Sequence, residues 1–111
     1  MALGAGGKPF NVTVTEQAAV VEIRVFGEID IVTAPVLQRH LDAVLDSPRR
    51  AVLIDLSETT FLDARGVGVL VNARKRITTA RGRLVIRRPP ALVRRVLELA
   101  DQVSRLEIVE D

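Results

Sequence analysis

Three aspartates, Asp30, Asp55 and Asp63, lie near the carboxyl ends of segments that have the composition of β-strands. Sheets of the α/β class bind ligands at that edge, so clustered carboxylates there could hold Mg²⁺ around an aspartate that accepts phosphate. Neither lysine of the chain, Lys8 or Lys75, accompanies them, and Asp55 stands inside an apolar run. We therefore favour a second interpretation, in which Asp63 caps a helix and Asp55 shapes a loop, and expect no metal or cofactor.

Nucleophilic catalysis has little support among the other side chains. The chain has no cysteine, its one histidine (His40) falls inside a predicted helix, and no serine lies in a Gly-x-Ser-x-Gly turn. The glycines of Gly66-Val67-Gly68 fit neither a P-loop nor a dinucleotide fingerprint, so we expect them to let a helix start pack tightly. The sequence predicts a protein that is not an enzyme.

The segment Phe61–Val69 is the most informative part of the chain. It reads as a strand-to-helix loop with an acidic cap, Asp63, and a small residue, Ala64, directly after it. Loops held by a rigid sheet often serve as recognition surfaces. Ala64 occupies the place where a modifiable hydroxyl could be expected, which makes this position the main functional question.

Hydrophobic periodicity and capping signals predict one α/β domain after a disordered tail at residues 1–8. The expected order is β-β-α-β-α-β-α-β, a small mixed sheet with helices packed against it. Strands are expected near 11–15, 20–26, 51–56, 84–86 and 106–109, and 57–63 is expected to be a loop. Helices are expected from the N-cap Thr33 with Pro35 to Ser47-Pro48, from Ala64 to Thr79, and after Pro89-Pro90.

The pattern also predicts which side chains are buried. In the second strand, one face should carry Val21, Ile23 and Val25 and the other Glu22 and Arg24. The dense apolar run from Val67 to Val71 predicts a deeply buried helix start. In the last helix the buried stripe is expected to comprise Leu92, Val93, Val96, Leu97 and Ala100.

Charge is unevenly distributed along the chain. The net charge is +2, yet residues 1–63 carry five basic and nine acidic side chains, and residues 64–111 carry eleven and five. The arginines of the second half lack interleaved aromatic residues, so a solvated face or a patch for an acidic protein is favoured over nucleic acid. They are Arg81, Arg83, Arg87, Arg88, Arg94 and Arg95. No apolar run could span a membrane and no secretion signal begins the sequence, so a cytoplasmic location is expected.

Two motifs resemble the signatures of the STAS domain. Residues 25–30, Val-Phe-Gly-Glu-Ile-Asp, precede a Thr-Ala-Pro helix start, and Ile54-Asp55-Leu56-Ser57 precedes the run from Thr60 to Leu70. The resemblance covers about residues 12–110, and its nearest form is the stand-alone anti-sigma-factor antagonist of bacteria. It assigns residues 9–111 to one STAS domain.

The resemblance implies a binding switch. Such antagonists capture an anti-sigma factor, usually a serine kinase with an ATPase fold, and so control sigma-factor-dependent transcription. The kinase phosphorylates a Ser or Thr directly after the aspartate of the second motif, which abolishes capture. By position, the implied partner interface comprises Glu28, Asp30, Thr33, Asp63, Ala64, Arg65 and Gly66.

The chain departs from the family where the phosphate would be attached. Ala64 cannot accept it, and phosphorylation would otherwise add a charge of about −1.5 to −2 beside Asp63. Three hypotheses follow: an antagonist without the switch, a switch moved to Ser57, Thr59 or Thr60, or a scaffold or sensor module. The sensor would bind an anion or nucleotide at Arg65 and the helix start, or another regulatory protein. A monomer or a weak homodimer is expected.

Overall fold

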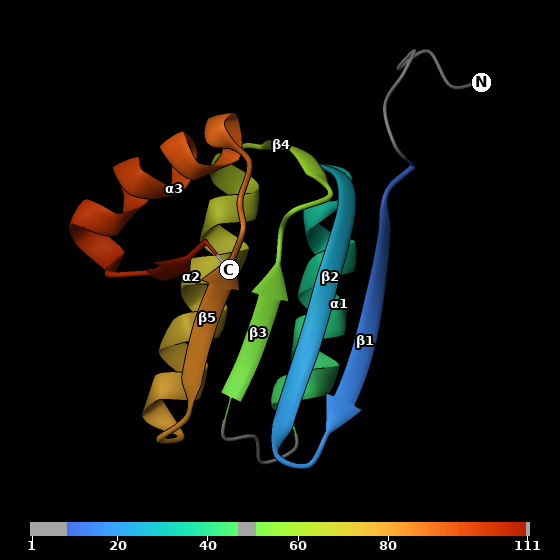
Figure 1. The fold of residues 1–111 in the computed structure, drawn as a ribbon, viewed down its shortest axis with the longest axis vertical. Helices are drawn as coiled ribbons and strands as arrows, with labels where there is room; N and C mark the ends of the chain where they lie inside the picture. Colours follow the sequence, from blue (N-terminus) through green and yellow to red (C-terminus); the bar gives the residue numbers. More distant parts are fainter. Residues whose placement is uncertain (1–8, 47–50, 111) are drawn as a thin grey trace.

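The computed structural model describes residues 9–46 and 51–110, which form a mixed sheet and three helices (Figure 1). The strands are β1 (Asn11–Gln17), β2 (Val20–Ile29), β3 (Ala51–Asp55), β4 (Thr59–Leu62), β5 (Arg83–Arg87) and β6 (Glu107–Val109). The helices are α1 (Ala34–Leu45), α2 (Ala64–Thr79) and α3 (Ala91–Ser104). This confirms the expected α/β architecture, with the short strand β4 added where a loop was expected. The expected tail at 1–8 and the helix end at Ser47-Pro48 lie outside the described residues.

The sheet has the strand order β1-β2-β3-β5-β6, and β4 pairs with β2 off this path. Strands β1 and β2 form an antiparallel hairpin, whereas β2–β3, β3–β5 and β5–β6 are parallel pairs. Parallel pairs need crossover connections, which α1, α2 and α3 supply. The carboxyl ends of β2, β3 and β5 therefore meet at one edge, and β4 extends that edge.

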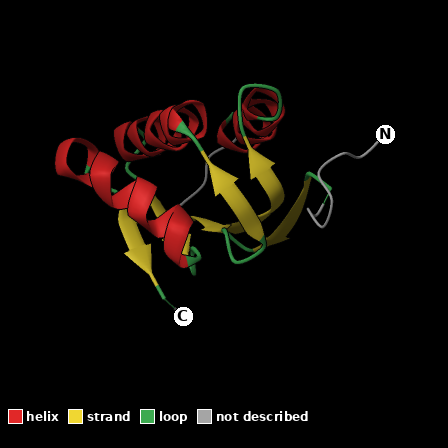
Figure 2. Cartoon of the chain, turned by 90° about the horizontal axis from the view of Figure 1, so that it is seen from above, coloured by secondary structure: helices red, strands yellow, loops and turns green. Residues whose placement is uncertain are grey.

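Helices α1 and α2 form a layer over one face of the sheet (Figure 2). The core lies between that layer and the alternating apolar side chains of β2. Val21, Ile23 and Val25 have no exposed surface, while Glu22 and Arg24 lie on the opposite face and are partly exposed. The predicted alternation of β2 is confirmed.

Strand β2 continues through the glycine at which the sequence predicted a break. Gly27 has φ 87°, a left-handed conformation that glycine adopts without steric cost. The pairing of β2 with β4 shifts register between Gly27 and Glu28, as at a β-bulge. The glycine therefore bends the strand without ending it, and residues 28 and 29 remain paired.

Two burial predictions were wrong. In the run Val67–Val71 only Leu70 is fully buried, and Gly68 is exposed, because a helix turns most of any five consecutive residues away from the core. In α3, Val93 and Leu97 are buried as predicted, but Leu92 is 79% exposed. The valines of the α2 run still pack partly against the core, whereas Leu92 of α3 does not.

Candidate partner-binding surface

The β2–β4 ladder brings the two segments of the predicted interface together. Glu28 pairs with Phe61 and Ile29 with Leu62 in parallel register. The backbone N–H of Asp63 donates to the carbonyl oxygen of Ile29 at 3.2 Å. Segments 28–33 and 63–66 therefore lie side by side at the upper end of the sheet (Figure 1). We call residues 28–33 and 61–66 the candidate surface.

Asp63 caps α2, as predicted. Its Oδ1 accepts hydrogen bonds from the backbone N–H groups of Arg65 at 2.9 Å and Gly66 at 3.2 Å. These two donors would otherwise be unpaired at the helix start. Ala64 and Arg65 are both exposed, so the position after the cap faces solvent. The carboxylate also occupies the place where an added anion would bind the helix N-terminus, which weighs against the sensor hypothesis.

Thr33 stands at the start of α1 as predicted, but its side chain does not cap the helix. Its hydroxyl donates to the carbonyl of Glu28 at 2.7 Å and accepts from the backbone N–H of Asp30 at 2.9 Å. Asp30 Oδ1 accepts instead from the backbone N–H groups of Val32 at 2.9 Å and Thr33 at 3.0 Å. The hydrogen bond from Thr33 N–H leads the interactions that lower the pKa of Asp30.

The two glycines of α2 have different roles. A Cβ at Gly66 would lie 2.4 Å from Leu62 Cδ1 and 2.6 Å from Ile29 Cγ2, so any side chain here would force these buried neighbours to shift. A Cβ at Gly68 would meet nothing within 4 Å. The expectation that the glycines permit close packing is confirmed for Gly66 and wrong for Gly68.

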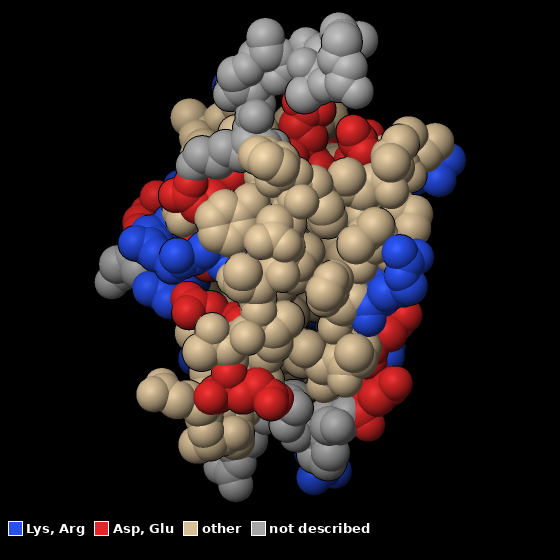
Figure 3. Space-filling model, turned by 90° about the vertical axis from the view of Figure 1, so that its right-hand side faces the viewer, with Lys and Arg blue, Asp and Glu red and all other residues tan. Residues whose placement is uncertain are grey.

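Apolar side chains that the sequence did not single out belong to the same surface. Ile31 is 59% exposed, Val32 74% and Phe61 47%. Glu28 beside them is also exposed, and acidic side chains lie at the upper end of the face nearest β1, as they do at several other places on it (Figure 3). The sequence does carry a signal for this exposed group, because the apolar pair Ile31-Val32 directly follows the polar end of β2. The arrangement suits a protein partner, because exposed apolar groups rimmed by charge mark protein interfaces.

The three alternative hydroxyls differ in access. Thr59 is 1% exposed and its Oγ1 donates to the carbonyl of Val25 at 2.9 Å, so this hydroxyl is used by the fold. Ser57 is partly buried and Thr60 is exposed. A groove of about 310 Å³ separates residues 57–60 from the start of α3 at 90–93.

Asp55 is a structural charge at the carboxyl end of β3. Its carboxylate is fully buried and accepts from Ser57 N–H at 2.8 Å, Arg88 at 2.8 Å and Arg24 at 3.3 Å. Burial raises the pKa of Asp55, but the hydrogen bonds from Ser57 and Arg88 and the charge of Arg24 outweigh it, and the pKa falls to about 2. The hydrogen bond to Ser57 confirms that Asp55 shapes a loop. Within residues 9–46 and 51–110, no three acidic or histidine side chains converge to hold a metal ion.

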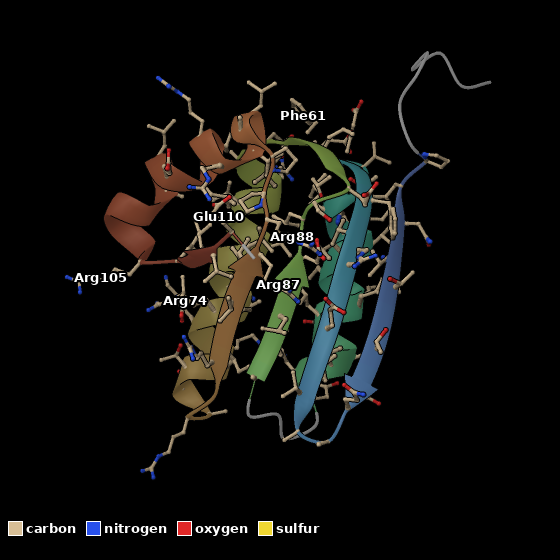
Figure 4. All side chains as sticks on the ribbon, in the orientation of Figure 1. Phe61, Arg74, Arg87, Arg88, Arg105 and Glu110 are labelled. Carbon is tan, nitrogen blue, oxygen red and sulfur yellow. The ribbon has the colours of Figure 1, made fainter. Side chains whose placement is uncertain are left out.

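Several arginines of the second half pair with acidic residues of this chain. Arg87 lies 3.2 Å from Glu22, Arg83 pairs with Glu107, and Arg94 pairs with Glu110. Figure 4 shows Arg87 and Arg88 near the end of β3. Together with Arg88, which pairs with Asp55, these arginines form ion pairs with acidic residues of their own chain. This finding argues against reading them as one patch for an acidic partner.

Comparisons with known proteins identify the family. The model of the family described as "Mlab, STAS domain" matches residues 12–106. The anti-sigma-B factor antagonist of Staphylococcus aureus (strain NCTC 8325 / PS 47) is 26% identical over 96 residues, which cover 86% of this chain and 80% of that protein. The chain belongs to the STAS domain family.

Solved structures agree with this assignment. An anti-sigma factor antagonist from Mycobacterium paratuberculosis has a TM-score of 0.80 and 31% identity, covering 93% of this chain and 87% of its own. The Bacillus cell fate determinant SpoIIAA in its phosphorylated form has a TM-score of 0.70 over 90% of each chain, at 18% identity, which shows a shared fold. In the described part of this chain, no helix is long and apolar enough to cross a membrane.

Proposed function

We propose that this protein is a cytoplasmic anti-sigma-factor antagonist that captures its regulator without a phosphorylation switch at position 64. The partner is an anti-sigma factor of the serine-kinase type, and binding it controls sigma-factor-dependent transcription. The family and its relatives support the general role. The observation that carries the missing switch is Ala64, which is exposed directly after the capping Asp63.

The candidate surface supplies what capture requires. Ile31, Val32 and Phe61 offer apolar area, and Glu28 and Arg65 offer exposed charges of both signs. Ala64 keeps the helix start small and uncharged at its own side chain. The surface therefore resembles one that is permanently in the unphosphorylated state, and capture is expected to depend on how much regulator is present.

The test uses purified protein and the anti-sigma regulators encoded by the same host. We expect one regulator to bind the natural chain. Ala64→Glu should weaken that binding at least about tenfold, because the new carboxylate would be buried in the contact without a partner, which costs over about 1 kcal/mol of binding free energy. Ala43→Glu, at an exposed position of α1, is the matched control and should bind normally. Equal binding by the natural chain and Ala64→Glu would contradict the proposed surface, and binding to no regulator would contradict the function.

A relocated switch is the second form of this proposal. Because Thr59 donates its buried hydroxyl to Val25, we place such a switch on the exposed Thr60 ahead of Ser57 and Thr59. Mass spectrometry after incubation with the binding regulator and ATP tests this form. An unmodified segment 57–60 disposes of it and leaves the antagonist without a switch.

A further inference from the structure

Helix α3 carries a second apolar stripe that the domain does not cover. Leu92 is 79% exposed and Leu99 is 67% exposed, and Val96 lies partly buried between them. The spacing i, i+4, i+7 places these three side chains along one line of the helix. Val93 and Leu97, on another side of the helix, are buried. The second face of α3 is thus only partly covered: Val96 touches the core, whereas Leu92 and Leu99 are left largely exposed.

The position of α3 leaves this stripe open. The helix packs against β4 and α2 and lies at the outer side of the domain, beyond β5 (Figure 1). In Figure 2 it runs apart from the layer that α1 and α2 form. A single exposed leucine is ordinary on a protein surface, but a row along one helix marks an interaction site.

The charges beside the stripe indicate what covers it. Arg95 and Glu98 are exposed on one flank of Leu92, Val96 and Leu99. They stand three residues apart, a spacing that permits an ion pair. Within the described part of the chain, neither side chain makes a hydrogen bond or ion pair. One flank thus presents both signs of charge, open for another molecule.

A second copy of the same helix matches this pattern. When two identical helices pack antiparallel about a two-fold axis, residue numbers run in opposite directions and each flank faces the same flank of its partner. Leu92 of one copy then faces Leu99 of the other, with Val96 near the axis. Arg95 faces Glu98 of the second copy, and Glu98 faces its Arg95. A partner with one sign of charge would match only half of the flank.

We propose that this protein forms a homodimer in which α3 packs antiparallel against α3 of a second copy. Leu92, Val96 and Leu99 form the apolar seam, and two Arg95–Glu98 pairs flank it. The inference does not depend on the proposed function, because it uses no residue of the candidate surface. It places the contact between copies on α3 and not on the edge strand β1.

The first test measures the oligomeric state of the full chain. Sedimentation velocity from about 5 to about 500 μM should show a reversible dimer, since small interfaces give weak association. Leu99→Ser should raise the dimer dissociation constant at least about tenfold, because the seam loses buried apolar area. Val14→Ser truncates an exposed apolar side chain on the edge strand β1 and is the control, which should dimerise normally. A monomer at every concentration would overturn the proposal.

The second test exchanges the flanking charges. Arg95→Glu alone and Glu98→Arg alone should each weaken self-association, because each places like charges opposite one another twice. Mixed in equal amounts, the two variants should form a heterodimer at least about as stable as the natural dimer, since both contacts are then between opposite charges. Circular dichroism confirms that both variants are folded. A dimer that the single changes leave intact, or a mixture that does not recover association, would refute the α3 interface.

Discussion

Asp55 and Asp63 both stand where a strand ends, yet the fold uses them in opposite ways. Asp55 is fully buried, and its carboxylate accepts hydrogen bonds from two arginines and a backbone N–H. Asp63 uses one oxygen to start α2 and leaves the residues after it exposed. The comparison teaches that a motif of one family can hold two kinds of carboxylate: one that is buried among cations, and one that caps a helix beside exposed residues.

The largest loss of stability is expected when the buried member of this pair, Asp55, is replaced. Asp55→Ala should lower the free energy of unfolding by about 2 to 3 kcal/mol, because the buried carboxylate that accepts from Ser57 N–H, Arg24 and Arg88 is lost, although the two arginines remain partly exposed to water. Urea unfolding measures the loss. Glu107→Ala, which breaks the more exposed pair with Arg83, is the control and should cost less than about 1 kcal/mol. Equal losses of unfolding free energy in the two variants would mean that the burial of Asp55 does not make it more stabilising than Glu107.

The contribution of Asp55 to stability should also depend on pH in the acidic range. The pKa of Asp55 is about 2 in the folded protein, below its ordinary 3.8. Its contribution, about 2 kcal/mol, is therefore present above pH 4 and is lost as the pH falls from about 4 to about 2. Unfolding free energies of the natural chain should decline over this range, and those of Asp55→Ala should decline less. Parallel curves would contradict a charged Asp55 at neutral pH.

The next effect concerns the helix start beside Asp63. Gly66→Ala should destabilise the domain by about 2 kcal/mol, because the new methyl group overlaps Leu62 and Ile29. Gly68→Ala, two residues away, has open space and should stabilise α2 by up to about 1 kcal/mol. Thermal melting of both variants gives the two signs in one experiment. Shifts of the same sign would show that the start of α2 is not fixed by its contact with β2 and β4.

The smallest effect separates the cap of Asp63 from its charge. Asp63→Ala should cost about 1 kcal/mol of stability, whereas Asp63→Asn, which still accepts the two hydrogen bonds, should stay within about 0.5 kcal/mol of the natural chain. Chemical denaturation measures both costs. A loss of regulator binding in Asp63→Asn at unchanged stability would show that the partner reads the charge.

Most of the fold could be predicted from local patterns. Alternation in β2 and the burial of Val93 and Leu97 in α3 depend only on periodicity, and both are confirmed. The capping role of Asp63 could also be predicted from the residues next to it in the sequence. Strand β4 could not be predicted, because four residues carry little periodicity and their pairing with β2 depends on the bulge at Gly27.

Side-chain partners across the sheet were less predictable. The links of Asp55 to Arg24 and Arg88 span 31 and 33 residues, and only the register of β2 and β3 and the path after β5 bring them together. Thr33 looked like a cap in sequence, but its hydroxyl reaches Glu28 because the preceding loop folds back on itself. The exposure of Leu92 depends on how α3 lies on β4 and α2, which no property of the helix alone determines.

The pairing of β2 with β4 has a thermodynamic consequence for recognition. Because Glu28–Phe61, Ile29–Leu62 and the hydrogen bond from Asp63 to Ile29 join the two halves of the candidate surface, the halves are held in one fixed arrangement. A partner that binds this surface then immobilises little additional backbone, and the entropic cost of association is small. Affinity at such a preorganised surface depends mainly on its exposed side chains, among them Ile31, Val32 and Phe61.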